Sequence, residues 1–261
     1  MAVLGVDIGG SSLKAGVVDL VAGRLVGDLV ELDTPQPAPP AALANAVRDV
    51  VARVGAGAGG SADVDPAKVD PNGAIGCTFP GRLRSGSSLA AVNLDESWVG
   101  ERPADHFERA VGRPFHVLND ADAAGLAEMH FGAGRERGGV VLVVTLGTGI
   151  GSALFMDGEL LPGTELGEVD VDGRPATEVA SWAAREELGL DWRAWADNVS
   201  RFLQRMQDLV DPQLIIVGGG VSEDPSQLGP ALRQPCEVVP AALGNAAGLI
   251  GAALFASHSS S

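Results

Sequence analysis

The amino-acid sequence predicts an α/β protein with a duplicated mixed-sheet plan, arranged as two lobes with a ligand cleft between them. The first observation is that residues 3–12 and 140–152 share one pattern, an apolar run that ends in a glycine-rich turn. The second is that another strand-like run follows each turn, at residues 14–20 and 153–157. The third is the length of 261 residues, which suits two compact lobes better than one or three.

Apolar runs, helical spacing and turn residues predict the order of elements along the chain. Short apolar runs predict strands at residues 3–8, 13–20, 25–33, 74–78, 115–118, 140–146, 152–157 and 214–217. Apolar residues at helical spacing predict helices at residues 43–54, 121–131, 177–187, 191–210 and 245–256. Low apolar content predicts a mobile loop at residues 55–70.

These elements suggest where the lobes begin and end. We expect an N-terminal lobe at residues 1–114, which carries the first glycine turn, and a C-terminal lobe at residues 115–244. We expect a C-terminal helix at residues 245–257 to pack on the N-terminal lobe. The serine-rich residues 258–261 are expected to form a disordered tail.

The composition restricts the classes of partner and compartment. A net charge of −16 repels nucleic acid and anionic membranes, so neither is an expected partner. Cys77 and Cys236 lie far apart in the sequence, which is typical of a reducing compartment without a disulfide framework. Residues 1–3 show no basic or apolar leader pattern, so no leader is expected, and no apolar run reaches about 18 residues. The sequence therefore predicts a cytoplasmic protein without a membrane span.

The two glycine turns are candidate phosphate sites. Glycine lets the backbone approach a ligand closely and aim successive N–H groups at it. Either turn alone is more typical of an ordinary hairpin, but two in one chain suggest a clamp around a phosphate chain. The glycine spacing of residues 147–151 does not fit a dinucleotide fingerprint, and no Gly-Lys-Ser/Thr P-loop occurs.

Four motifs follow one another along nearly the whole chain. They are Asp7-Ile8-Gly9-Gly10-Ser11, the Leu-Asn-Asp-Ala-Asp-Ala-Ala-Gly run at 118–125, the Leu-Gly-Thr-Gly-Ile-Gly-Ser run at 146–152, and the Gly-Gly-Gly-Val-Ser run at 218–222. Together with segments 34–38, 95–100 and 239–248, they resemble the ROK sugar kinases, within them the polyphosphate or ATP glucokinase branch. The resemblance implies a two-lobed actin-like, ribonuclease-H-like ATPase fold.

The resemblance also implies roles for individual residues. Asp120 is the expected general base, which takes the proton of a sugar hydroxyl, and Asp7 is expected to bind Mg²⁺ through water. The expected donor-binding residues are Asp7, Gly9, Gly10, Ser11, Ser12, Lys14, Thr145, Gly147, Thr148, Gly149, Gly218, Gly219 and Gly220. The expected substrate-binding residues are Gly81, Asn93, Asn119, Glu165, Glu168 and Glu178. We expect Asp122 to face solvent or to cap the helix that follows Asn119.

The expected sugar pocket departs from the family pattern at two positions. The family signature Asn-Thr-Glu-x-Gly-His occurs here as residues 163–168, with Glu168 in place of the histidine, so a hydrogen-bond donor is lost. A second family glutamate aligns with Thr177, although Glu178 could replace it with a one-residue shift. These changes suggest an altered sugar preference, weakened catalysis or a protein that binds without turnover.

The donor side departs as well. Residues 223–225 are Glu-Asp-Pro, where polyphosphate-using relatives carry lysines. Acidic residues oppose a long polyanion, so this change and the negative net charge favour ATP or a short donor. The Cys-rich zinc signature of many ROK members is absent, and no structural zinc is expected.

The leading interpretation is Mg²⁺-dependent transfer of a terminal phosphoryl group to the 6-hydroxyl of glucose or a related hexose. Two alternatives are a non-catalytic sugar- or nucleotide-binding relative and a kinase for another polyol or amino sugar, with glucosamine as the test case. ROK repressors carry an N-terminal DNA-binding helix-turn-helix, whereas this chain begins at the first strand, so DNA binding is not expected. The expected partners are the sugar, the phosphoryl donor and a second copy of the chain in a homodimer.

Overall fold

A computed structural model describes residues 1–56, 70, 72–91, 94–223 and 234–259. The chain divides into two compact units, and each is described by itself. The first contains Met1–Ala127 and Ala246–Ser261, and the second contains Glu128–Asn245. The lobe boundaries suggested by the sequence stay a prediction, and most of the expected mobile loop lies outside the described residues.

The first unit is built on a five-stranded sheet in the order β3-β2-β1-β4-β7. Its strands are β1 (Ala2–Ile8), β2 (Ser12–Asp19), β3 (Arg24–Asp33), β4 (Ile75–Phe79) and β7 (Phe115–Asn119). The first three form an antiparallel meander, whereas β4 pairs parallel with β1 and β7 pairs parallel with β4. All five were expected from the sequence to within one or two residues at each end.

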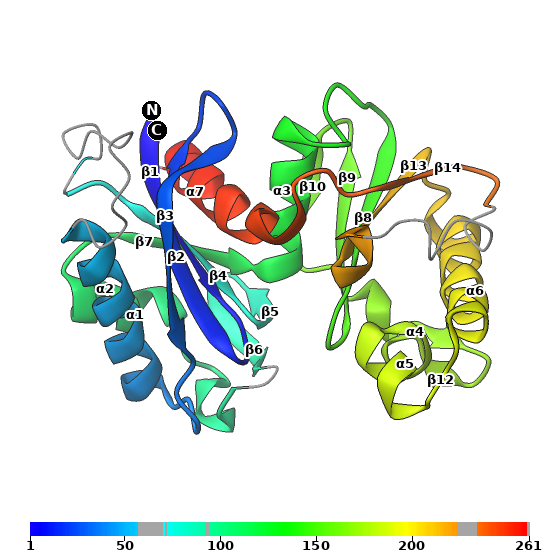
Figure 1. Cartoon of the computed structure of the whole chain (residues 1–261), viewed down its shortest axis with the longest axis horizontal. Helices are drawn as coiled ribbons and strands as arrows, with labels where there is room; N and C mark the ends of the chain where they lie inside the picture. The colour runs from blue at the N-terminus through cyan, green and yellow to red at the C-terminus, as the bar shows by residue number, and fades with distance from the viewer. Residues whose placement is uncertain (57–69, 71, 92–93, 224–233, 260–261) are drawn as a thin grey trace. The chain divides into compact units, whose positions relative to one another are not determined.

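Opposite faces of this sheet pack against different helices. Leu4, Val6 and Ile8 alternate along β1 and join the core beneath α1 (Pro40–Gly55) and α2 (Pro103–Val111). The intervening positions face α7 (Ala247–Ser259), as Figure 1 shows from the red helix beside the blue and cyan strands.

Two glycines of the sheet allow α7 to approach closely. A Cβ added at Gly5 would lie 2.6 Å from the Leu249 carbonyl oxygen, and one at Gly76 only 1.8 Å from that of Ala252. A side chain at either position would therefore push the helix off the sheet.

Smaller elements complete the first unit. The hairpin of β5 (Gly81–Arg84) and β6 (Ser87–Ala91) follows β4, and the short helix α2 was not expected from the sequence. Trp98 is fully buried, and its Nε1–H donates to the Ala38 carbonyl at 2.9 Å. Helix α3 (Asp120–Phe131) begins directly after β7, and its last turn belongs to the second unit.

The second unit repeats the plan with a five-stranded sheet in the order β10-β9-β8-β13-β14. Its strands are β8 (Val140–Leu146), β9 (Ile150–Met156), β10 (Glu159–Leu161), β13 (Leu214–Gly219) and β14 (Glu237–Pro240). Strands β8, β13 and β14 are parallel, and β9 pairs antiparallel with β8. The long helix α6 (Trp192–Val210) buries Trp195, Phe202 and other apolar side chains against one face of this sheet.

The helix expected at residues 177–187 is interrupted, which corrects the sequence-based prediction. It forms α4 (Thr177–Ala180) and α5 (Trp182–Glu187), separated by Ser181 in an extended conformation. The Ser181 side chain accepts a hydrogen bond from the Ala184 N–H at 3.0 Å and so starts a new helix. The β-ribbon of β11 (Asp170–Val171) and β12 (Arg174–Pro175) precedes α4. Within the described residues, no helix has the length and apolar character needed to cross a bilayer.

Candidate active site

Three parallel strands of the first unit deliver polar side chains to one edge of the sheet. Asp7 is the penultimate residue of β1, Thr78 that of β4, and Asn119 is the last residue of β7. The carboxyl ends of parallel strands meet at the same edge, which is where ligands bind in open α/β sheets. The first unit therefore carries one part of the candidate site at this edge.

The turn at residues 9–12 joins β1 to β2 and is anchored through its carbonyl groups. The Gly9 N–H closes it by donating to the Ser12 carbonyl at 2.9 Å. The backbone N–H and the hydroxyl of Thr34 donate to two more carbonyls of the turn, at 2.9 and 2.7 Å. The Gln36 side-chain amide donates to the fourth at 2.9 Å.

The N–H groups of Gly10 and Ser11 show the opposite behaviour. Neither donates to an acceptor within the part of the chain that the structure describes. A turn whose carbonyls are occupied and whose N–H groups are available presents positive dipole ends to a ligand. This geometry suits the phosphate role expected from the sequence.

Asp7 lies beside this turn in a largely buried position. Its Oδ1 accepts a hydrogen bond from the Thr78 hydroxyl at 2.6 Å. Burial raises the pKa of the Asp7 carboxyl, whereas the hydrogen bond from Thr78 and the positive charge of Lys14 lower it. Lys14 is opposite Asp7 in the β1–β2 register, and its Nζ is 3.9 Å from Glu31.

Asn119 fixes the start of α3. Its Oδ1 accepts from the N–H groups of Ala121 and Asp122, at 2.8 and 3.1 Å, so it caps the helix. Its Nδ2 donates to the Gly81 carbonyl at 3.1 Å. Gly81 has φ +146°, a conformation that favours glycine, and is thereby brought next to Asn119.

Asp120 is the first residue of α3, and its side chain is exposed. Its Oδ1 accepts from the Ala121 N–H at 2.9 Å. Negative charge is favourable at a helix N-terminus, because the first N–H groups of the helix carry the positive end of its dipole. The structure thus presents a carboxylate at the edge where the parallel strands of the first unit end.

Asp122 does not face solvent, which corrects one of the two expectations for it, whereas the expected capping role stays a prediction. It is 4% exposed, between Ala121 at 4% and Ala123 at 0%. Helix α7 packs against this turn so closely that a Cβ at Gly251 would lie 1.7 Å from the Ala123 carbonyl oxygen. The first turn of α3 is therefore buried behind Asp120. This burial was not predictable from the sequence, because the apolar residues at 121–127 look like those of an ordinary amphipathic helix.

The second unit carries the second glycine turn, between β8 and β9. The Gly147 N–H donates to the Gly149 carbonyl at 2.9 Å. The Gly147 carbonyl accepts from the Ala183 N–H at 3.2 Å, and the Ile150 N–H donates to the Thr177 hydroxyl oxygen at 3.0 Å. Helices α4 and α5 therefore both anchor this turn.

The glycines at the end of β13 lie directly beside the end of β8. Gly218 pairs with Thr145 and Gly219 with Leu146. Gly219 has φ +88°, and a Cβ there would lie 2.3 Å from the Leu146 carbonyl oxygen, so both conformation and space require glycine. Gly220 follows in a short 3₁₀ turn with nothing within 4 Å of its Cβ position. The structure thus brings the second and third glycine segments together.

Glu165 and Glu168 lie on a 3₁₀ turn attached to β9. The Ser152 hydroxyl donates to the Thr164 carbonyl at 2.7 Å and accepts from the Leu166 N–H at 3.0 Å. A Cβ at Gly167 would lie 2.1 Å from the Ile150 carbonyl oxygen, so the turn presses directly on the strand. Both glutamates are exposed, on the same short turn.

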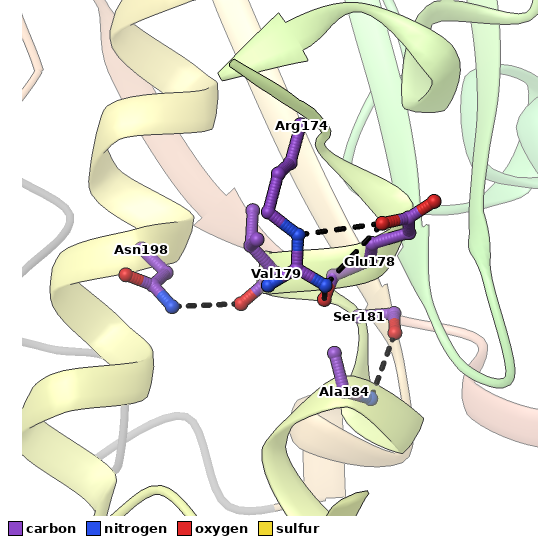
Figure 2. Close-up of polar contacts among 6 residues, drawn as sticks. All are labelled: Arg174, Glu178, Val179, Ser181, Ala184 and Asn198. Atoms are coloured by element: carbon purple, nitrogen blue, oxygen red, sulfur yellow. Dashed lines mark hydrogen bonds and ion pairs between the residues drawn. The ribbon is translucent and has the colours of Figure 1, made fainter. Parts of the chain in front are cut away.

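Thr177 and Glu178 are adjacent in sequence but have different surroundings. Thr177 contacts the second glycine turn, as described above. Glu178 points to Arg174, and Figure 2 shows the guanidinium of Arg174 meeting its carboxylate, with the shortest separations at 3.3 Å. The Glu178 side chain is 53% exposed. Its expected role in sugar binding stays a prediction, as does that of Asn93, which lies outside the described residues.

The number of carboxylates at the site decides which metal sites are possible. No group of three or more His, Cys, Asp or Glu side chains gathers among the described residues. Mg²⁺ in phosphoryl transfer is held by one or two carboxylates together with substrate phosphates and water. Asp7 alone, beside a phosphate-type turn, fits that requirement. Asp224 and Pro225, from the Glu-Asp-Pro segment at residues 223–225, lie outside the described residues, as does the side chain of Glu223.

Sequence reasoning missed three residues that support the site. Thr78 holds Asp7, while Thr34 and Gln36 hold the first turn. Thr34 and Gln36 belong to a proline-rich segment that already contributed to the family resemblance. The sequence therefore marked this segment but did not indicate that it holds the first turn. Thr78 had only its place at the end of a buried strand.

Comparison with solved structures identifies the class of fold. A ROK family glucokinase from Streptomyces griseus, solved in complex with glucose and AMPPNP, superposes with a TM-score of 0.81 at 26% identity, covering 99% of this chain and 100% of the other. The polyphosphate/ATP-glucomannokinase of Arthrobacter sp. strain KM superposes with a TM-score of 0.89 at 41% identity, over 99% of each chain. The fold is therefore the two-lobed actin-like ATPase fold that the sequence predicted.

Sequence comparison identifies the family. The ROK family profile matches residues 3–170. The polyphosphate glucokinase of Mycobacterium tuberculosis is 41% identical over 251 residues, which covers 96% of this chain and 89% of the relative. The chain belongs to the ROK family.

Proposed function

We propose that this protein is a sugar kinase, which transfers the terminal phosphoryl group of ATP or polyphosphate to the 6-hydroxyl of glucose or a related hexose. The observation that carries the proposal is the edge of the first sheet, where Asp120 starts α3 and Asp7 stands beside a turn with available N–H groups. The names of relatives at 41% identity support the reaction class.

Asp120 is the proposed general base. A sugar hydroxyl is a weak nucleophile, and a carboxylate within hydrogen-bond distance takes its proton as the bond to phosphorus forms. The remaining N–H of the Asn119 amide is the group that Asn119 offers to a sugar, because its Oδ1 already accepts two helix N–H groups. Asn119 thus both orients the start of α3 and contributes one donor.

The glycine turns are the proposed donor-binding elements. The Gly10 and Ser11 N–H groups supply dipoles in the first unit, and Lys14 supplies positive charge on the neighbouring strand. Positioning and neutralisation of charge provide most of the rate in phosphoryl transfer. Mg²⁺, which Asp7 would hold through water, supplies further neutralisation of the donor phosphates when it is bound.

Two finer statements belong to the same proposal. We infer that the chain acts as a homodimer, as the family resemblance implies, which light scattering on the purified protein would test. We also infer a cytoplasmic location, supported by two cysteines, Cys77 and Cys236, that are both free thiols.

The test is phosphorylation of glucose by the purified protein with Mg²⁺, using ATP and polyphosphate as separate donors. Turnover with either donor is expected, and Asp120→Asn should lower kcat by about 10²- to 10⁴-fold while donor binding is retained. Full activity of Asp120→Asn would refute its role as the base. Binding of glucose and ATP without turnover in the wild-type protein would instead favour the non-catalytic alternative.

A further inference from the structure

Thr78 forms two hydrogen bonds that link the end of β4 to the end of β1. Its Oγ1 accepts from the Ile8 N–H at 2.9 Å and donates to Asp7 Oδ1 at 2.6 Å. Thr78 is 0% exposed, so it touches no ligand itself. A hydroxyl has one proton to donate. Because the Thr78 oxygen is the acceptor for the Ile8 N–H, the Thr78 proton is the one shared with Asp7.

The backbone explains why a side chain is needed there. The parallel ladder between β1 and β4 runs through Gly5–Gly76 and Val6–Cys77 and then stops. Beyond that point, the Thr78 hydroxyl takes the place of a backbone acceptor for Ile8. The two strands therefore separate at the edge that carries Asp7. The Ile8 N–H, just before the first turn, still has an acceptor in the Thr78 hydroxyl.

Asp7 is confined from a second side by α7. Asp7 follows Gly5 by two residues and so shares its face of the strand, which α7 covers. A Cβ at Gly248, in the first turn of α7, would lie 3.1 Å from Asp7 Oδ1 and 3.5 Å from Oδ2. Glycine at position 248 therefore leaves the carboxylate its space, whereas alanine would press on it.

Oδ2 of Asp7 differs from Oδ1 in its surroundings. It forms no hydrogen bond within the part of the chain described by the structure, while Oδ1 is held by Thr78. A carboxylate fixed through one oxygen is pre-oriented for whatever its other oxygen binds, because less freedom is lost on binding.

We propose that Thr78 is a positioning residue for phosphoryl transfer: it holds Oδ1 of Asp7, and Gly248 leaves room for that orientation, so that Oδ2 is presented to the metal-bound donor phosphates. This inference rests on the proposed function, because it assigns a partner to the expected metal-binding carboxylate. It adds two residues, Thr78 and Gly248, that sequence reasoning had not placed in the site.

The experiment compares Thr78→Val with Thr78→Ser in two assays. Mn²⁺ binding in the presence of ATP or polyphosphate is measured by the electron paramagnetic resonance of free Mn²⁺, and glucose phosphorylation is measured with each donor. Thr78→Val should weaken Mn²⁺ binding and lower kcat by about tenfold or more, with the KM for glucose unchanged. Thr78→Ser keeps the hydroxyl and should stay within about threefold of wild type.

A second pair of variants separates positioning from stability. Val47→Ala removes buried apolar volume from α1 without touching Asp7 and should leave Mn²⁺ binding unchanged while it lowers the melting temperature. Gly248→Ala should weaken Mn²⁺ binding in the same direction as Thr78→Val, and it tests the idea even if Thr78→Val fails to fold.

Each result has a definite reading. Mn²⁺ binding by Thr78→Val and Gly248→Ala equal to wild type would overturn the inference, as would equal losses in Thr78→Val and Thr78→Ser. Donor-dependent Mn²⁺ binding that is absent from the wild-type protein would also overturn it. A last outcome separates the two proposals. If the wild-type protein binds Mn²⁺ with a donor, and this binding depends on the Thr78 hydroxyl, but no sugar is phosphorylated, the proposed kinase function is refuted. The positioning of Asp7 by Thr78 then still stands.

Discussion

Thr177 and Ile150 are joined by a hydrogen bond of 3.0 Å from the Ile150 N–H to the Thr177 hydroxyl oxygen. The family resemblance implies a sugar-pocket glutamate at position 177, or at Glu178 with a one-residue shift. In this chain Thr177 instead holds the end of the second glycine turn. The hydroxyl of Thr177 is therefore an anchor of the second glycine turn, which belongs to the proposed donor site.

Thr177→Val tests that anchor. The Ile150 N–H would lose its acceptor, at a cost of about 1 kcal/mol, and the turn would lose one of its attachments. The KM for the phosphoryl donor should rise by about fivefold, with Thr177→Ser close to wild type. A rise in the KM for glucose alone would assign Thr177 to the sugar instead.

Glu168→His restores the histidine of the family signature. The Glu168 side chain is exposed, so this position can accept the change without repacking. Because the imidazole supplies a donor that an ionised carboxylate lacks, the KM for glucose should fall by about three- to tenfold. Steady-state kinetics with glucose and glucosamine would check this. If both sugars give the same kinetics in wild type and variant, position 168 does not contact the sugar.

Gly219→Ala and Gly220→Ala form a matched pair at the end of β13. Gly219 has φ +88° and meets the Leu146 carbonyl oxygen, so alanine there should destabilise the fold by about 2 kcal/mol or more. Gly220 has open space around its Cβ position, and its alanine variant should stay within about 0.5 kcal/mol of wild type. Urea denaturation of both proteins would contradict the prediction if the two midpoints coincide.

Glu128 is a buried carboxylate that acts as a structural anchor. It is 1% exposed, with Oε1 accepting from the Leu243 N–H at 2.8 Å and Oε2 from those of Ala133 and Ala242, at 2.9 and 3.1 Å. Glu128→Ala would leave three N–H groups without an acceptor and should lower the free energy of unfolding by about 3 kcal/mol or more. Glu128→Gln, which keeps an acceptor oxygen, should lose less, and equal losses would show that the hydrogen bonds are not the cause.

The two thiols should differ in reactivity and in their effect on stability with pH. Burial, and secondarily the negative charge of Asp7, raises the pKa of Cys77 well above its ordinary value of 9.0, and burial also raises that of Cys236. When the pKa of a thiol is higher in the folded than in the unfolded protein, the folded state keeps its full stability at pH values below the unfolded pKa. It loses stability progressively as pH rises through the folded pKa. Unfolding free energy should therefore fall as pH rises above about 9, less steeply in Cys77→Ala.

Alkylation of the native protein provides the companion measurement. Cys236 is partly exposed and should react with iodoacetamide, whereas Cys77, at 0% exposure, should react only after denaturation. Mass spectrometry of the labelled peptides distinguishes the two sites. Labelling of Cys77 at the rate of Cys236 would mean that β4 opens in the native state.

The strands and the glycine turns were predictable because their signals are local. Residues 3–12 and 140–152 each contain an apolar strand, a turn that needs glycine and a second strand within one short window. The interruption of the 177–187 helix was not predictable in the same way. Its cause is a serine whose capping of Ala184 prevailed over a continuous helical pattern.

The sequence by itself determined the fold class, the family and the segments that carry the candidate site, because each depends on residues close together in the chain. Only the tertiary structure decided how these segments are held. Thr78 is 71 residues from Asp7, and Glu128 is 115 residues from Leu243. Such pairs arise from strand order, register and helix packing, and no local pattern states which hydroxyl will meet which carboxylate.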